Sequence, residues 1–188
     1  MRPNNKWSLF VAALCVCGLI VAALSLTLFP RVLGYRTFRI HTATMEPTLM
    51  TEDHILADLK CYGSRTPERG DIIVFLYPRD RSAFFVKRVV AIEGDTIEVR
   101  GKKVILNGTE LEEPYAQYLY DRSRTAYGHR PDMKPTKVPE ACVFVMGDNR
   151  DRSADSRHFG FVPLADVEGK VLFVYWNPDA LDRIGTTF

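Results

Sequence analysis

The feature that most constrains this chain is an uncharged apolar run near its N-terminus. Residues 8–29, SLFVAALCVCGLIVAALSLTLF, form a stretch of 22 residues without a charged side chain. At a rise of about 1.5 Å per residue, a helix of this length is roughly 33 Å long, which is enough to cross a hydrocarbon core of about 30 Å. The run therefore predicts a membrane anchor at 8–29, preceded by a short tail of residues 1–7.

A cleavable signal peptide is the alternative interpretation of this run. The apolar region of such peptides usually extends over only about 7–15 residues. Here Pro30 and Arg31 follow the run, where a cleavage site would require small residues. A retained anchor is therefore favoured. Basic residues flank the run in nearly equal number on both sides, so the positive-inside rule assigns no orientation to it.

The composition beyond the run is that of an ordinary globular domain. The formal net charge is +2, with 46% hydrophobic and 26% charged residues, and the basic residues are spread along the chain. Nucleic-acid binding usually requires a concentrated basic face, so no nucleic-acid partner is expected. Cys61 and Cys142 are isolated from other cysteines and form no metal motif, and a disulfide between them stays open as an alternative.

From residue 36 onward the chain has the pattern of a mainly β domain, which we expect to extend over residues 36–188. Short apolar or alternating runs bounded by glycine and proline predict strands, at 55–59, 71–75, 84–92, 96–100, 103–106, 142–146 and 171–176. The two runs around Gly101 and Lys102 predict a hairpin. Many short strands indicate a barrel or a sandwich. The polar segment 115–139 is expected to be a long excursion from the sheet.

The stretch HTATMEPTLM, residues 41–50, lies directly after the apolar N-terminus and has neither helical nor strand periodicity. Thr42 and Thr44 offer two hydroxyl groups that share one side in an extended segment. Threonine and proline are also common in simple turns, so from this stretch alone a turn without a chemical role is the alternative.

Lys87 lies in a run, FFVKRVVAIEGD (84–95), that predicts a buried strand, because apolar residues occupy both of its faces. Burial disfavours the ammonium form and lowers the pKa of a lysine, and a neutral amine near pH 7 can act as a general base. The alternative is a lysine that reaches the surface or pairs with an acid. We expect the neighbouring Arg88 to have such a structural role.

The third notable segment is MGDNRDRSADSRHFG, residues 146–160, which follows an apolar strand. Its acidic and basic residues alternate closely and predict a loop held by its own ion pairs. A calcium loop is the alternative, with Asp148, Asp151 and Asp155 as ligands. The EF-hand pattern is absent, and two arginines among the acids offset the charge that a cation requires.

Together these segments resemble bacterial type I signal peptidases. An apolar span, TMEPT (44–48), RGDIIVF (69–75), VKRVVAIEGD (86–95) and GDNRDRSADSRHFGFVP (147–163) occur in the order of that family, and NGTELEEPY (107–115) is similar to one of its linking segments. The resemblance covers most of residues 8–176. It implies a membrane-anchored serine protease with a Ser/Lys dyad in a β-rich catalytic domain.

The resemblance also implies roles for single residues. The residue before the family methionine is the nucleophile, which here is Thr44, and Lys87 aligns with the general base. Thr42 stands for the serine that donates to the oxyanion. The family usually has Ser-Gly-Ser-Met where this chain has Thr-Ala-Thr-Met. Both positions therefore keep a hydroxyl group and gain a methyl group, which restricts χ1.

Four further positions match the family motif. Ser153 corresponds to the serine that orients the lysine, and Asp155 and Arg157 correspond to a structural ion pair near the site. Met45 corresponds to the methionine that lines the substrate groove. No metal and no organic cofactor are implied.

The function expected from the resemblance is removal of N-terminal signal peptides from exported preproteins with small residues at −1 and −3. The catalytic domain would lie on the extracytoplasmic side of the cytoplasmic membrane, with a single pass through the lipid bilayer and residues 1–7 in the cytoplasm. Threonine is a competent nucleophile beside a base, so activity is expected. The alternative is a catalytically impaired relative that binds exported peptides without cleaving them.

Overall fold

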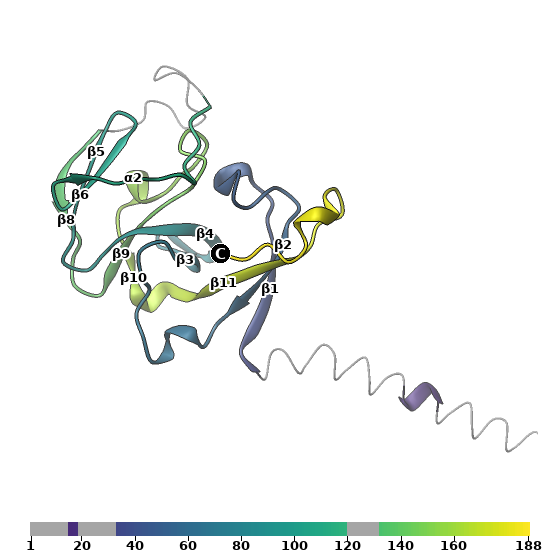
Figure 1. Cartoon of the computed structure of the whole chain (residues 1–188). Helices are drawn as coiled ribbons and strands as arrows, with labels where there is room; N and C mark the ends of the chain where they lie inside the picture. Colours follow the sequence, from purple (N-terminus) through teal and green to yellow (C-terminus); the bar gives the residue numbers. More distant parts are fainter. Residues whose placement is uncertain (1–14, 19–32, 120–131) are drawn as a thin grey trace, which may run out of the picture. The chain divides into compact units, whose positions relative to one another are not determined.

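The structure is a computed structural model that describes residues 15–18, 33–119 and 132–188 (Figure 1). The predicted tail, residues 1–7, and the predicted anchor, residues 8–29, lie outside the described residues except for the helical residues 15–18. Within the described segments, no helix has the length and hydrophobicity needed to cross a bilayer. The chain divides into two units after residue 36, and the second unit carries all the features discussed below.

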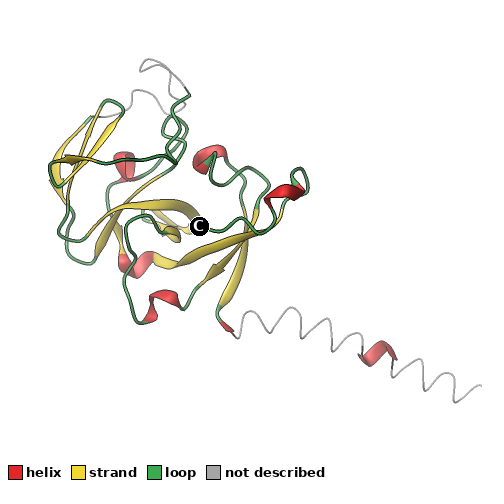
Figure 2. Ribbon diagram, in the orientation of Figure 1, coloured by secondary structure: helices red, strands yellow, loops and turns green. Residues whose placement is uncertain are grey.

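The predicted mainly β fold is confirmed (Figure 2). The strands are β1 (Tyr35–Arg39), β2 (His54–Asp58), β3 (Ile72–Tyr77), β4 (Asp80–Ile92), β5 (Thr96–Arg100), β6 (Lys103–Leu106), β7 (Thr109–Glu110), β8 (Met133–Lys137), β9 (Cys142–Met146), β10 (Val162–Pro163) and β11 (Val167–Trp176). The short helices are the α-helix α2 (Ser156–Phe159) and the 3₁₀ helices η1 (Ala43–Met45), η2 (Cys61–Gly63), η3 (Leu164–Asp166) and η4 (Leu181–Arg183).

The strands of the described residues form two sheets. The larger sheet has the order β1-β2-β11-β3-β4-β9-β10, and the smaller has the order β7-β6-β5-β8. In Figure 1 the smaller sheet lies to one side of β4 and β9, away from β1 and β2. The predicted hairpin is β5 and β6, which pair antiparallel. Gly101 in its turn has a φ of 62°, a left-handed conformation that glycine adopts at little cost.

β3 lies in the middle of the larger sheet because its apolar side chains suit burial on both faces. Ile72 and Val74 pack into one buried cluster with residues of β2 and β11. Ile73 and Phe75 point the other way, into a cluster with Val89 of β4. β4 pairs with β3 on one side and with β9 on the other. Lys87, in the part of β4 that lies between these strands, is therefore buried.

The prediction for residues 115–139 was wrong in one part. Residues 133–137 form β8, which pairs antiparallel with β5 at the edge of the smaller sheet. The sequence did not predict this strand because it contains Pro135, and proline, which lacks an N–H, argues against a strand except at the edge of a sheet. Cys61 and Cys142 are both free thiols, so the structure contains no disulfide between them.

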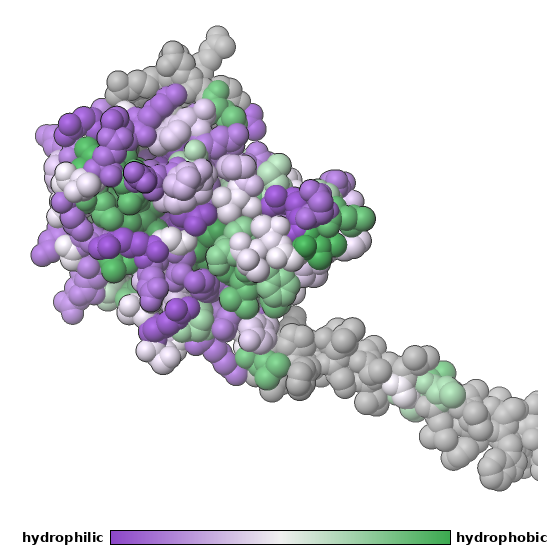
Figure 3. All heavy atoms as spheres, in the orientation of Figure 1, coloured by the Kyte–Doolittle hydropathy of each residue, from purple (hydrophilic) through white to green (hydrophobic). Residues whose placement is uncertain are grey.

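The surface carries both hydrophilic and hydrophobic side chains. The face shown in Figure 3 is largely hydrophilic, with a hydrophobic group over the C-terminal loop that carries η4. In this loop Leu181 and Ile184 are exposed, as are Tyr175 and Trp176 at the end of β11.

Candidate active site

Thr44 lies on the 3₁₀ turn η1, which begins a few residues after the end of β1. Two apolar anchors hold this turn: Met45 and Leu49 are 1% and 0% exposed, and both belong to the cluster beneath β2 and β3. The backbone N–H of Leu49 donates to the carbonyl of Met45 at 2.9 Å. Burial of these side chains leaves the hydroxyl group of Thr44 at the surface of the core, partly exposed.

Lys87 reaches the same point from β4. Its side chain is buried, and Nζ lies 3.0 Å from Oγ1 of Thr44 and donates to the carbonyl of Val86 at 2.9 Å. Nζ also lies 5.3 Å from the ring centroid of Phe85. The two groups are 43 residues apart in the sequence, and the pairing of β3 with β4 beside the anchored turn brings them together.

Burial lowers the pKa of Lys87 to about 8, although Asp155 and Asp148 act in the opposite direction. The desolvation of the ammonium therefore outweighs the attraction of two carboxylates. With such a pKa about a tenth of the amine is neutral at pH 7, so Lys87 can accept a proton from the neighbouring hydroxyl group.

Thr42 precedes the turn, in extended conformation with φ −135° and ψ 147°. Its Oγ1 lies 3.4 Å from Oγ1 of Thr44. The segment forms a turn, as the alternative interpretation of this stretch expected. The two hydroxyl groups nevertheless lie close together, as expected for an extended segment. Thr42 is exposed, so a group bound in front of Thr44 can reach both oxygens.

Ser153 is buried, and its Oγ and the Thr44 carbonyl both lie beside Gly147. The role of Ser153 in orienting Lys87 stays a prediction. Its Oγ makes no hydrogen bond of normal geometry with the described residues, although it lies close enough to Asp155 to help lower the pKa of that carboxyl group. The Val86 carbonyl, not the Ser153 hydroxyl, is the second partner of Nζ. The Ser153 hydroxyl group is thus buried close to the turn that carries Thr44, without a hydrogen bond to Nζ of Lys87.

Gly147 explains how Ser153 and the turn approach each other. A Cβ atom on Gly147 would overlap Oγ of Ser153 and the backbone carbonyl of Thr44, and would lie 2.6 Å from Cβ of Ser153. Only glycine leaves room for both groups. The carbonyl of Thr44 also accepts the backbone N–H of Asn149 at 3.2 Å, so the loop after β9 supports the turn that carries Thr44 directly.

Asp155 and Arg157 form a buried bidentate ion pair. The Nε–Oδ1 and Nη2–Oδ2 distances are both 2.8 Å, and the two side chains are 0% and 1% exposed. Burial raises the pKa of Asp155, but Arg157 and the N–H of Gly147 more than offset it and bring the pKa to about 2. The carboxylate also accepts the Arg157 N–H and so caps α2.

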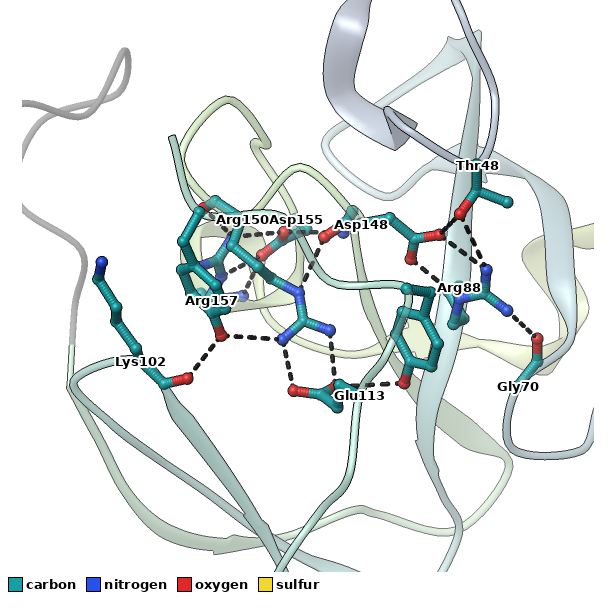
Figure 4. Close-up of polar contacts among 12 residues, drawn as sticks. Thr48, Gly70, Arg88, Lys102, Glu113, Asp148, Arg150, Asp155 and Arg157 are labelled. Atoms are coloured by element: carbon teal, nitrogen blue, oxygen red, sulfur yellow. Dashed lines mark hydrogen bonds and ion pairs between the residues drawn. The ribbon is translucent and has the colours of Figure 1, made fainter. Parts of the chain in front are cut away.

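A second ion pair, which the sequence did not identify as part of the site, joins Arg88 of β4 to Asp148 of the loop after β9. Arg88 donates to both oxygens of Asp148 at 2.9 and 2.7 Å, and Thr48 of the turn that carries Thr44 donates to the same carboxylate at 2.5 Å (Figure 4). Arg88 therefore has the expected structural role. Among the residues that the structure describes, no group of three His, Cys, Asp or Glu side chains could hold a metal ion.

A cleft of about 210 Å³ opens in front of the two hydroxyl groups. Its walls are Arg39, Ile40, His41, Thr42, Thr44, Met45, Phe84, Phe85, Val86, Lys87 and Ala154. The predicted groove residue Met45 is among them, whereas Phe84–Val86 and Ala154 were missed. These residues could have been predicted to line the cleft because they lie next to Lys87 and Ser153 in the sequence. The apolar part of these walls is formed by Ile40, Met45, Phe84, Phe85, Val86 and Ala154.

Comparison with known proteins places this geometry in context. A model of the family described as signal peptidase, peptidase S26, matches residues 12–176. A signal peptidase I of Bacillus caldolyticus is 36% identical over 180 residues, covering 93% of this chain and 92% of the relative. A signal peptidase I of Leptolyngbya laminosa is 34% identical over 168 residues, covering 81% and 77%. A crystal structure of a signal peptidase I from Enterococcus faecalis is 35% identical and covers 56% of this chain and 97% of that chain, with a TM-score of 0.45.

Proposed function

The chain belongs to the signal peptidase family, peptidase S26, and we propose that it is a membrane-bound endopeptidase that removes N-terminal signal peptides from exported preproteins. The observation that carries this proposal is the 3.0 Å distance between Thr44 Oγ1 and Lys87 Nζ, in a cleft with apolar walls. A hydroxyl group beside a buried amine is the arrangement of an activated nucleophile and its base.

In the proposed first step, the neutral amine of Lys87 takes the hydroxyl proton of Thr44 while Oγ1 attacks the scissile carbonyl carbon. A C–O bond forms, and the electron pair of the carbonyl moves to its oxygen. The Thr44 backbone N–H and the Thr42 hydroxyl group donate to that oxyanion. When the tetrahedral intermediate collapses, the C–N bond breaks and Lys87 returns the proton to the leaving amine.

The second step reverses the same chemistry with water as the nucleophile. Lys87, neutral again, accepts a proton from a water molecule, which attacks the ester carbonyl of the acylated Thr44. Collapse of this intermediate breaks the ester bond and returns the proton to Oγ1. The pKa of Lys87, lowered to about 8 by burial, suits both directions of proton transfer because it lies near the working pH.

The proposed partners are preproteins with small residues at −1 and −3 and the lipid bilayer. The cleft of about 210 Å³, with the apolar side chains of its walls beside Thr44, supports the first, and the uncharged run at 8–29 supports the second. We propose residues 1–7 as a cytoplasmic tail and residues 36–188 as an extracytoplasmic peptidase domain. Protease added to spheroplasts should digest the large domain and spare the tail, and protection of the large domain would reverse this topology.

A catalytically impaired relative that binds exported peptides without cleaving them is the other candidate. The methyl group of Thr44 is the feature that favours it, because misplacing a nucleophile by about 1 Å can slow a reaction roughly 10²-fold. The 3.0 Å contact with Lys87 shows that the methyl group leaves room for the hydrogen bond, so cleavage is the better-supported function.

The deciding experiment incubates the detergent-solubilised full chain with a preprotein and measures the mature product. The wild type should cleave, whereas Lys87→Ala should be reduced to background because the base is gone. Lys87→Arg should fail as well, since a guanidinium group stays protonated. Product from either variant in amounts close to wild type removes Lys87 from the mechanism, and a wild type that binds the preprotein without cutting it establishes the impaired relative.

A further inference from the structure

The segment of residues 113–118, which follows β7, runs beside the loop of residues 147–150 (Figure 4). The Gln117 N–H donates to the Asp148 carbonyl at 2.7 Å, and the Arg150 N–H donates to the Gln117 carbonyl at 2.9 Å. These bonds form a parallel bridge between Gln117 and Asn149. The smaller sheet is thus attached to the loop that supports Thr44.

Arg150 and Glu113 form the strongest link between the two segments. Arg150 donates to the two carboxylate oxygens of Glu113 at 2.7 and 2.6 Å, and the side chains are 0% and 7% exposed. A bidentate pair of this kind fixes orientation as well as distance. Although burial lowers the pKa of Arg150, the pair with Glu113 more than offsets it and raises the pKa above its usual value.

The remaining contacts of Arg150 lead toward Thr44. Its Nε donates to the carbonyl of Gly147 at 3.0 Å, and its own carbonyl accepts from Arg157 at 2.8 Å. Between these points, the Asn149 N–H donates to the carbonyl of Thr44 at 3.2 Å. The guanidinium group of Arg150 therefore holds the backbone of residues 147–150, which is hydrogen-bonded to the turn that carries Thr44.

Two tyrosines brace this pair. The guanidinium carbons of Arg88 and Arg150 lie 4.1 and 5.9 Å from the centroid of the Tyr115 ring. The Tyr115 hydroxyl group donates to Glu113 at 3.2 Å. Tyr118 lies 3.4 Å from Arg150 and donates to the carbonyl of Lys102 in the β5–β6 turn at 2.6 Å. The smaller sheet is consequently the outer support of the pair.

We propose that Glu113 is a positioning residue for the nucleophile: through Arg150 it holds residues 147–150 in the place that keeps Thr44 Oγ1 within reach of Lys87. This inference rests on the proposed function. Glu113 touches neither Thr44 nor Lys87, so it acts on the reaction only through the loop. Removing its charge leaves Arg150 buried without an anion, and the loop then shifts to let the guanidinium group reach water.

The test compares Glu113→Gln with a matched control, Glu112→Gln, in the full-length protein. Glu112 is exposed and makes none of these contacts. Glu113→Gln should lower kcat for preprotein cleavage by about 10–10²-fold with KM changed by less than about threefold, because a misplaced nucleophile affects the chemical step rather than binding. Glu113→Asp keeps the charge and should fall between Glu113→Gln and wild type. Rates are expressed per folded molecule, from the thermal unfolding curve of each variant.

A second readout needs no cleavage. Hydrogen exchange followed by mass spectrometry should show faster exchange of the backbone amides of residues 147–150 in Glu113→Gln than in Glu112→Gln. The amides of β2, residues 54–58, should exchange alike in both variants. A residue that only stabilised the fold would raise exchange in both segments and leave kcat per folded molecule unchanged.

The outcomes separate the two proposals. If wild type cleaves and Glu113→Gln keeps its kcat, or if exchange in 147–150 matches the control, the positioning role is wrong while the peptidase function stands. If wild type cleaves nothing, the proposed function is wrong, and the exchange comparison still decides whether Glu113 holds the loop.

Discussion

The turn of residues 42–48 and the loop of residues 147–157 meet at Thr44, yet they are held by opposite kinds of interaction. The buried side chains that anchor the turn are apolar, namely Met45 and Leu49. Its threonines are more accessible: Thr42 is exposed, and Thr44 and Thr48 are half-buried. The loop is built from polar side chains that are almost completely buried, namely Asp148, Asn149, Arg150, Asp151, Ser153, Asp155 and Ser156.

This difference determines how each region should respond to substitution. Neither Thr42 nor Thr44 belongs to an ion pair, so removing either hydroxyl group should act mainly on the chemistry that the group performs. In the loop, each of four charged groups has several partners at low dielectric, namely Asp148, Arg150, Asp155 and Arg157. The loss of one partner disturbs the others. In the proposed mechanism the turn supplies the attacking hydroxyl group, whereas the loop holds that group in position.

The largest effect is expected at Thr44. Thr44→Ala removes the attacking oxygen and should reduce preprotein cleavage to background. Thr44→Ser keeps the oxygen and removes only the methyl group, so cleavage should continue at a rate equal to or above wild type. Both variants should unfold at the wild-type temperature, because Thr44 is not a core residue. Cleavage by Thr44→Ala would exclude it as the nucleophile, and an inert wild type beside an active Thr44→Ser would identify a disarmed peptidase.

Thr42→Ala should give the second largest effect. Its hydroxyl group faces that of Thr44 at 3.4 Å, and an oxyanion donor typically contributes about 10²–10³ in turnover. We expect kcat to fall by that amount with little change in thermal stability. Cleavage lost in Thr42→Ala but retained in Thr44→Ala would exchange the roles of the two threonines.

Gly147→Ala tests the loop rather than the turn. The added Cβ would overlap Ser153 and the Thr44 carbonyl, so turnover should fall about 10²-fold through displacement of the nucleophile. The overlap should also lower stability by about 1–3 kcal/mol, measured by thermal unfolding. Gly63→Ala is the matched control, because a Cβ there has no atom within 4 Å. Equal activity of the two variants would contradict the close approach at Gly147.

The smallest effect is the pH dependence of cleavage by the wild type, which reports on the protonation of Lys87. Because the pKa of Lys87 is lowered to about 8, the neutral amine is a minor species at pH 7 and the major one at pH 9. The rate constant for cleavage should therefore rise about tenfold between these values, with its midpoint near 8. A flat profile over this range would indicate a base with a different pKa.

Much of the fold could be predicted from the sequence because β-strands have local signals. Alternating or continuous apolar runs identified the strands that carry Lys87 and precede the polar loop, and Gly101 marked the hairpin turn. The strand at 133–137 was missed, since its pairing with β5 rather than its own composition makes it a strand. Membership of the family was also visible, because the motifs occur in order along the chain.

What the sequence by itself determined is the set of groups that we propose to react: two threonine hydroxyls beside a methionine, and a lysine flanked by apolar residues that desolvate it. Only the tertiary structure decided which groups touch. Lys87 bonds the Val86 carbonyl rather than Ser153, and Arg150 pairs with Glu113 across 37 positions of the sequence. The physical reason is that burial follows local hydrophobic pattern, whereas the partners of buried polar groups depend on which distant loops the packed sheets bring into contact.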